Sequence, residues 1–169
     1  ANLRADNRAG RTAEESAERI ADLVRGRIYR IGRLQTGSDL DTTMRLRLGY
    51  LEAARDVNAS ACMDYVRTDR LDQRAAIGPD LMAQEQRFAT ALVEAGQLTQ
   101  PQPSKASTAS VPGELVEKVM KGTRLSNERV SAAMMNKGSD ADQCAVTIAL
   151  LRFTLGWKGP ERTAILRTL

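Results

Sequence analysis

Two cysteines, a few neighbouring carboxylates and a group of arginines are the residues of this 169-residue chain that could do chemistry. The chain contains no histidine, which excludes Ser–His–Asp and Cys–His catalysis, histidine-ligated metals and imidazole pH switching. Cys62 could act as a nucleophile only with a lysine or a carboxylate as its base, and no motif supplies that partner. We therefore predict no catalytic residue and expect a protein that is not an enzyme.

The two cysteines, Cys62 and Cys144, are far apart in the sequence. In an exported protein we expect them to form one disulfide, which would stabilise the fold by about 2–4 kcal/mol. In a reducing compartment they would instead be two buried thiols that pack as small hydrophobic groups. The compartment decides between these alternatives, and we favour the disulfide.

Three carboxylate pairs are close enough in sequence to share a metal ion: Glu14 with Glu15, Glu14 with Glu18, and Asp140 with Asp142. A di-metal site in a helical bundle normally uses Glu-x-x-His motifs, and these are absent here. Acidic residues at the start of a helix are explained by the helix dipole. Because phosphate-binding glycine motifs are also absent, we predict neither a metal nor a cofactor.

Four arginines cluster near the tip of a predicted helical hairpin: Arg30 and Arg33 end its first helix, and Arg45 and Arg47 lie in the first turns of its second. Guanidinium groups in such a cluster could contact phosphates, anionic lipid or an acidic partner. We take these four residues as a candidate interaction patch. The alternative is a solvated face that the helix dipole favours.

Three polar residues fall where apolar side chains are expected. Arg55 and Asn58 lie on the apolar stripe of the predicted second helix, and Arg152 is isolated in the most apolar segment of the chain. As candidate buried polar residues they could fix the register or the oligomeric state. The alternatives are a local twist that turns Arg55 and Asn58 outward and, for Arg152, the ion pair that we favour.

The composition predicts an all-α fold. Hydrophobic residues make up 42% of the chain, enough for a core, whereas aromatic residues make up only 4%. β-Sandwiches need more aromatic strands and more turns than this sequence offers. We expect a long antiparallel helical hairpin plus a third helix, with a smaller C-terminal helical subdomain.

A polar N-terminal arm (1–11) precedes the hairpin. Thr12 and Glu15 have the spacing of a capping box and open the first helix. A tight break at 35–38 leads into a second, continuous helix that runs to about Thr68. Two long helices with so short a connection are expected to pack antiparallel.

The third helix begins at Gly78-Pro79 and ends at Gly96, completing a body that spans 12–96. We expect it to bury its apolar side chains, which are Leu81, Met82, Phe88, Ala89, Leu92 and Val93.

A Pro/Ser/Thr/Gln-rich linker or loop (97–113) follows the body. Residues 114–169 have the pattern of short helices, and we expect this subdomain to pack on the body. The segment from Cys144 to Phe153 is apolar nearly all round, which predicts a central, buried helix.

The net charge of +4 is unevenly distributed, because residues 1–96 are balanced and residues 97–169 carry the excess. A helix-turn-helix in 126–155 would place Asp140 and Asp142 at the start of its recognition helix, where phosphates repel them. We therefore do not expect nucleic acid as the main partner. We expect the partner to be another protein, of unknown identity, or a second copy of this chain that associates through the hairpin.

Arginine outnumbers lysine 20 to 5 and alanine is abundant, a bias that favours a GC-rich bacterial source. No apolar run is long enough to cross a membrane. The sequence begins at Ala1 without a methionine. Cleavage of a signal peptide, removal from a longer anchored protein, or loss of the initiator residue would each explain that start.

We expect a non-enzymatic protein–protein interaction or scaffold protein of a bacterial envelope, either periplasmic or membrane-tethered facing the periplasm. It would act through its amphipathic helix faces. The alternative is a cytoplasmic adaptor or regulator that binds nucleic acid or an acidic partner through the arginine-rich hairpin tip.

Overall fold

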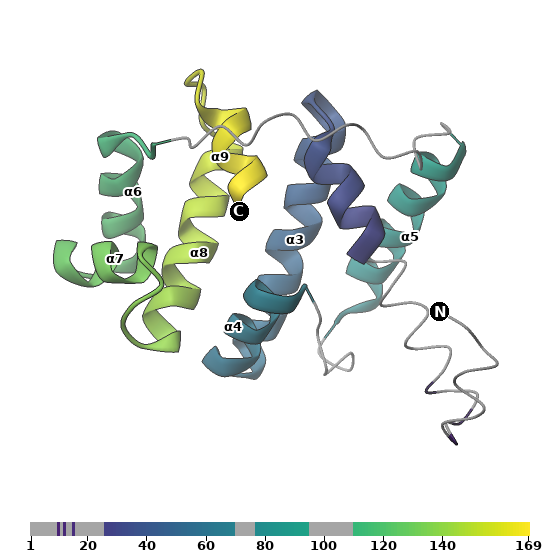
Figure 1. The fold of residues 1–169 in the computed structure, drawn as a ribbon, viewed down its shortest axis with the longest axis horizontal. Helices are drawn as coiled ribbons and strands as arrows, with labels where there is room; N and C mark the ends of the chain where they lie inside the picture. Colours follow the sequence, from purple (N-terminus) through teal and green to yellow (C-terminus); the bar gives the residue numbers. More distant parts are fainter. Residues whose placement is uncertain (1–9, 11, 13–14, 16–25, 70–76, 95–109) are drawn as a thin grey trace.

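The structure, a computed structural model, describes residues 10, 12, 15, 26–69, 77–94 and 110–169. Within these residues all regular structure is helical and no strand occurs, which confirms the predicted all-α fold (Figure 1). A helix covers residues 26–34, and the labelled helices are α3 (Gly37–Val57), α4 (Ala59–Thr68), α5 (Pro79–Glu94), α6 (Gly113–Thr123), α7 (Asn127–Met134), α8 (Asp140–Leu155) and α9 (Arg162–Thr168).

The predicted capping box is confirmed. The backbone N–H of Glu15 donates to Thr12 Oγ1 at 3.1 Å, and the N–H of Thr12 donates to Glu15 Oε2 at 2.8 Å. Of the predicted first helix, residues 16–25 lie outside the described residues. So do most of the predicted arm (1–11) and of the predicted linker (97–113).

The helix 26–34 and α3 form an antiparallel pair joined by Gln35 and Thr36. The edge of the Tyr29 ring packs on the ring of Tyr50, with 6.1 Å between the centroids. Tyr50 in turn stacks on Tyr65 of α4, with 5.7 Å between the centroids. These three buried aromatic rings pack the hairpin against α4.

The predicted second helix is not continuous, so that part of the prediction is wrong. The backbone at Asn58 is extended (φ −173°, ψ 169°) and separates α3 from α4. The side-chain oxygen of Asn58 accepts a hydrogen bond from the N–H of Ala61 at 2.8 Å. Asparagine is among the preferred residues for capping a helix start, and here it starts α4 in the middle of an apolar stripe.

Helix α8 lies between α6 and α7 on one side and α3 and α4 on the other (Figure 1). Apolar side chains cover both of these sides of α8. One side, which includes Ile148 and Leu151, packs against α3 and α4. The other side, which includes Val146 and Leu150, packs against α6 and α7. The prediction of a central, buried helix is therefore confirmed, and α8 belongs to both hydrophobic clusters.

The sulfur atoms of Cys62 and Cys144 lie 2.04 Å apart, which is the distance of a disulfide bond. The bond joins α4 to α8 across 82 residues of sequence, inside the hydrophobic cluster that these helices share. Of the two alternatives for the cysteines, the structure therefore contains the disulfide.

Arg55, Asn58 and Arg152 were candidates for buried polar residues, and this is corrected because all three are exposed, as their alternatives predicted. The break at Asn58 ends α3 one turn after Arg55, whose guanidinium pairs with the adjacent Asp56 at 2.9 Å. Arg152 forms the favoured ion pair, with Glu52 of α3 at 2.5 Å. These residues are therefore surface groups.

Helix α5 begins at Pro79 as predicted and ends at Glu94, whereas the predicted end at Gly96 lies outside the described residues. It packs on α3 through a narrow face on which Phe88 and Leu92 are buried. Two further apolar side chains expected to be buried are exposed, Met82 by 45% and Val93 by 56%. The buried side of α5 is narrower than predicted.

Candidate functional site

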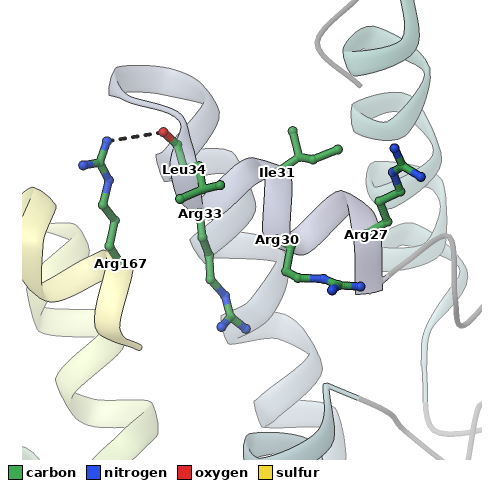
Figure 2. A pocket seen from close by; sticks show the side chains of 6 residues that line it. All are labelled: Arg27, Arg30, Ile31, Arg33, Leu34 and Arg167. Atoms are coloured by element: carbon green, nitrogen blue, oxygen red, sulfur yellow. Dashed lines mark hydrogen bonds between the residues drawn. The ribbon is translucent and has the colours of Figure 1, made fainter. Parts of the chain in front are cut away.

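A pocket with a volume of about 490 Å³ opens beside the helix 26–34, near the end of the hairpin. We call it the arginine pocket. Its lining among the described residues consists of Arg27, Arg30, Ile31, Arg33, Leu34 and Arg167 (Figure 2). The volume is in the range of sites that hold small ligands or a few side chains of a partner.

The lining residues from helix 26–34 share one face because of their spacing. Arg27, Arg30, Ile31 and Leu34 are three or four positions apart, which places them on one side of a helix. Arg33 lies at the edge of that face. The helix therefore presents cationic side chains along a stripe that also carries two apolar residues.

Arg167 reaches the pocket from the opposite end of the chain. Its Nη2 donates to the carbonyl oxygens of Leu34 at 3.4 Å and Gln35 at 3.1 Å, and Figure 2 draws the first of these bonds. The last carbonyls of a helix have no partner within the helix, and a cation is favourable there. Arg167 therefore attaches α9 to the hairpin tip and completes the pocket.

Arg33 connects the pocket to an ion cluster that we call the Asp69 cluster, made of Arg33, Arg47 and Asp69. Arg33 Nη2 donates to both carboxylate oxygens of Asp69, at 2.8 and 2.9 Å. Arg47 pairs with the same carboxylate, and its guanidinium lies 5.5 Å from the ring centre of Tyr65. Asp69 ends α4 in a left-handed conformation (φ 54°).

The Asp69 cluster contains two guanidinium groups and one carboxylate. The side chain of Arg47 is only 3% exposed, whereas those of Arg33 and Asp69 are 24% and 27% exposed. Burial lowers the pKa of Arg33, repulsion from Arg47 lowers it further, and Asp69 opposes both effects. An arginine stays charged at any physiological pH, so the cluster carries an excess of positive charge.

The four arginines predicted as one patch are not brought together as such. Arg30 and Arg33 line the arginine pocket, whereas Arg47 is buried behind it and is not available to a partner. Arg45 is exposed on α3 and does not contribute to the lining. The expectation that all four arginines form one patch is therefore corrected, because proximity to the hairpin tip does not fix which way each side chain turns.

Two lining residues were not predicted as site residues. Arg27 lies three positions before Arg30, so helical spacing could have placed it on the same face. Arg167 is separated from Leu34 by 133 residues. No local signal connects them, because the contact depends on how α9 packs.

In the part of the chain that the structure describes, no group of three or more cysteine or carboxylate side chains is arranged to hold a metal ion. None of the described helices combines the length and the apolar character needed to cross a membrane.

The described residues define a class of protein: an all-α protein in which a disulfide links α4 to α8 and arginines line a pocket at the hairpin. No protein-family model matches the chain, and neither a curated protein nor a solved structure matches it. The observations that bear on its function therefore lie in the site itself.

Proposed function

We propose that this protein is a non-enzymatic binding module that holds an acidic segment of a partner protein in the arginine pocket. The observation that carries the proposal is that four of the six described lining residues are arginines. Guanidinium groups bind carboxylates through paired, charge-assisted hydrogen bonds, and they do so with geometric selectivity. Acidic side chains are therefore the complementary chemistry.

The directions of the guanidinium groups favour an extended occupant with several acidic groups. In Figure 2 the side chains of Arg27, Arg30 and Arg33 point in different directions and do not converge on one point. A segment with several carboxylates could meet them one by one, and its apolar side chains could contact Leu34. Among the described lining residues none is aromatic, so this part of the pocket offers no platform on which nucleic-acid bases would stack.

We further propose that the module works in a bacterial envelope, either in the periplasm or tethered to a membrane that faces it. The disulfide supports this location, because such bonds persist in oxidising compartments. Non-reducing mass spectrometry of protein from its native source tests the location. A mass with the bond intact is expected, and two free thiols would contradict it.

Binding is tested with a fluorescein-labelled oligoglutamate peptide and the full chain, by fluorescence anisotropy at several salt concentrations. Arg30→Gln is the informative variant, because Arg30 is exposed and donates a local hydrogen bond to the carbonyl of Gly26 in the preceding turn. We expect Arg30→Gln to weaken binding about tenfold, as the loss of one charge-assisted hydrogen bond would. Arg55→Gln removes an exposed arginine of α3 and should leave the affinity unchanged.

Three results would refute the proposal. One is equal binding of oligoglutamate and of an uncharged oligoglutamine of the same length. Another is an equal loss of affinity in Arg30→Gln and Arg55→Gln, which would make the interaction a general effect of surface charge. The third is tighter binding of single-stranded oligothymidylate than of oligoglutamate with a loss in Arg30→Gln, which would favour a nucleic-acid adaptor.

A further inference from the structure

Arg33 belongs both to the arginine pocket and to the Asp69 cluster. Among the described residues, Arg33 is the one through which a ligand in the pocket could affect the packing of helix 26–34 against α3 and α4. On one side its Nη2 binds Asp69, and Asp69 also binds the buried Arg47. The Arg33 side chain lines the pocket and is 24% exposed, while its guanidinium binds Asp69.

The Asp69 cluster combines two cationic side chains with one carboxylate. Among the described residues, Asp69 is the only carboxylate that forms an ion pair with Arg33 or Arg47. The Nε atoms of both arginines are buried and have no hydrogen-bond partner. A buried cation without full compensation is unfavourable, because the low-dielectric surroundings solvate it less well than water does.

We infer that a carboxylate of the acidic partner segment pairs with Arg33 and supplies the negative charge that the Asp69 cluster lacks. This inference rests on the proposed function and adds a consequence to it: binding in the pocket stabilises the packing of helix 26–34 against α3 and α4. A ligand that binds the folded state and not the unfolded chain raises the stability of the folded state. Here that gain depends on the charge balance of the Asp69 cluster.

The test compares the rise in Tm that oligoglutamate causes in the full, oxidised chain with the rise in variants that change the charge balance. Asp69→Asn removes the carboxylate, so it should lower the Tm without peptide and give a larger rise with peptide than the wild type shows. Arg47→Met removes one cation and leaves Arg33 and Asp69 as a balanced pair. Its rise should be smaller than that of the wild type.

Two further variants complete the series. Arg33→Gln should weaken oligoglutamate binding about tenfold, in line with one lost charge-assisted hydrogen bond, and should abolish most of the rise in Tm. Arg55→Gln should show the oligoglutamate affinity and the rise in Tm of the wild type. Oligoglutamine, tested at the same ionic strength, should cause no rise in any variant.

The two proposals fail in different ways. If oligoglutamate binds and Arg30→Gln weakens it, but the rise in Tm is the same in wild type and Arg47→Met, the coupling through Arg33 is wrong and the binding function stands. If oligoglutamate does not bind the wild type, both are wrong. Because Arg47→Met replaces a buried charge by an apolar side chain, it decides the question even if Asp69→Asn does not fold.

Discussion

Gly32 of the first helix lies directly against Thr43 of α3. A Cβ atom added at Gly32 would lie 2.0 Å from Thr43 Oγ1 and within 3 Å of two other atoms of that side chain. Thr43 is fully buried, and its hydroxyl donates to the carbonyl of Asp39 at 2.8 Å. The close approach of these two helices therefore requires a residue without a side chain at position 32.

This contact predicts that Gly32→Ala lowers the free energy of unfolding by about 2 kcal/mol, the usual effect of overpacking a core. Urea denaturation followed by circular dichroism measures the change. Gly26→Ala is the matched control on the same helix, because nothing lies within 4 Å of a Cβ atom added there. It should raise stability by up to about 1 kcal/mol, since alanine favours a helix more than glycine does. If both substitutions changed the free energy of unfolding equally, the close contact between Gly32 and Thr43 would be contradicted.

The disulfide between Cys62 and Cys144 closes a long loop inside the core. The double variant Cys62→Ala/Cys144→Ala should be less stable than the oxidised chain by about 2–4 kcal/mol, since the bond restricts the unfolded chain. Urea denaturation with and without a reductant measures this. The reductant should destabilise the wild type and leave the double variant unchanged. A wild type that is insensitive to full reduction would show that the bond adds no stability.

One helix start was predicted from a side chain and its partner that lie three residues apart. Thr12 with Glu15 is a capping contact that a short window of sequence contains. Helix α8 begins at Asp140, and its N-cap is Ser139, whose side-chain oxygen accepts a hydrogen bond from the N–H of Asp142.

The break at Asn58 was not predicted, because apolar residues continue in helical spacing on both sides of it. Asn58→Ala should lower stability by about 1 kcal/mol through loss of the N-cap of α4. Ser60→Ala, an exposed change in the first turn of the same helix, should have little effect. Thermal unfolding of both variants measures the difference. If Asn58→Ala were as stable as the wild type, the Asn58 cap would not contribute to the stability of the α4 start.

Asp142 near the start of α8 makes stability depend on pH. Arg129 donates hydrogen bonds to both of its carboxylate oxygens, at 2.9 and 2.6 Å, and these bonds lower the pKa of Asp142. A carboxylate whose pKa is lowered by folding stabilises the folded state above its unfolded pKa. That contribution is lost as the pH falls through the folded value.

Asp142→Asn should therefore lower the Tm at neutral pH, and the difference from wild type should shrink as the pH falls from about 5 to about 2. Calorimetry over that range measures it. Asp64→Asn, which changes an exposed carboxylate of α4 in a long ion pair of 4.0 Å, is the control and should have little effect. If the Tm difference between Asp142→Asn and wild type grew as the pH fell, the lowered pKa of Asp142 would be contradicted.

The pocket itself could be predicted only in part. Arg30 and Arg33 belong to a local pattern, but the turn of Arg47 toward Asp69 depends on where α4 ends. Contacts made by the C-terminal helix α9 span even longer stretches, such as the 121 residues between Arg162 and Asp41. Such pairs follow from the docking of whole helices and leave no trace in sequence spacing.

Substitutions of two arginines in α9 distinguish an effect on ligand binding from an effect on stability. Arg167 lines the arginine pocket, whereas Arg162 pairs with Asp41 at 2.6 Å and is absent from the described lining. Both side chains attach α9 to the hairpin, so Arg167→Gln and Arg162→Gln should each lower the Tm. Only Arg167→Gln should also weaken the binding of oligoglutamate, by about threefold to tenfold, because a positive charge of the pocket is lost.

Fluorescence anisotropy at a temperature well below both transitions makes that comparison with folded protein. Oligoglutamate affinities that fall equally in Arg167→Gln and Arg162→Gln would show that binding depends on the docking of α9 as a whole. An unchanged affinity in Arg167→Gln would remove the C-terminal helix from the binding site. A loss confined to Arg167→Gln is expected, because its guanidinium is the one that reaches the carbonyls of Leu34 and Gln35 beside the pocket.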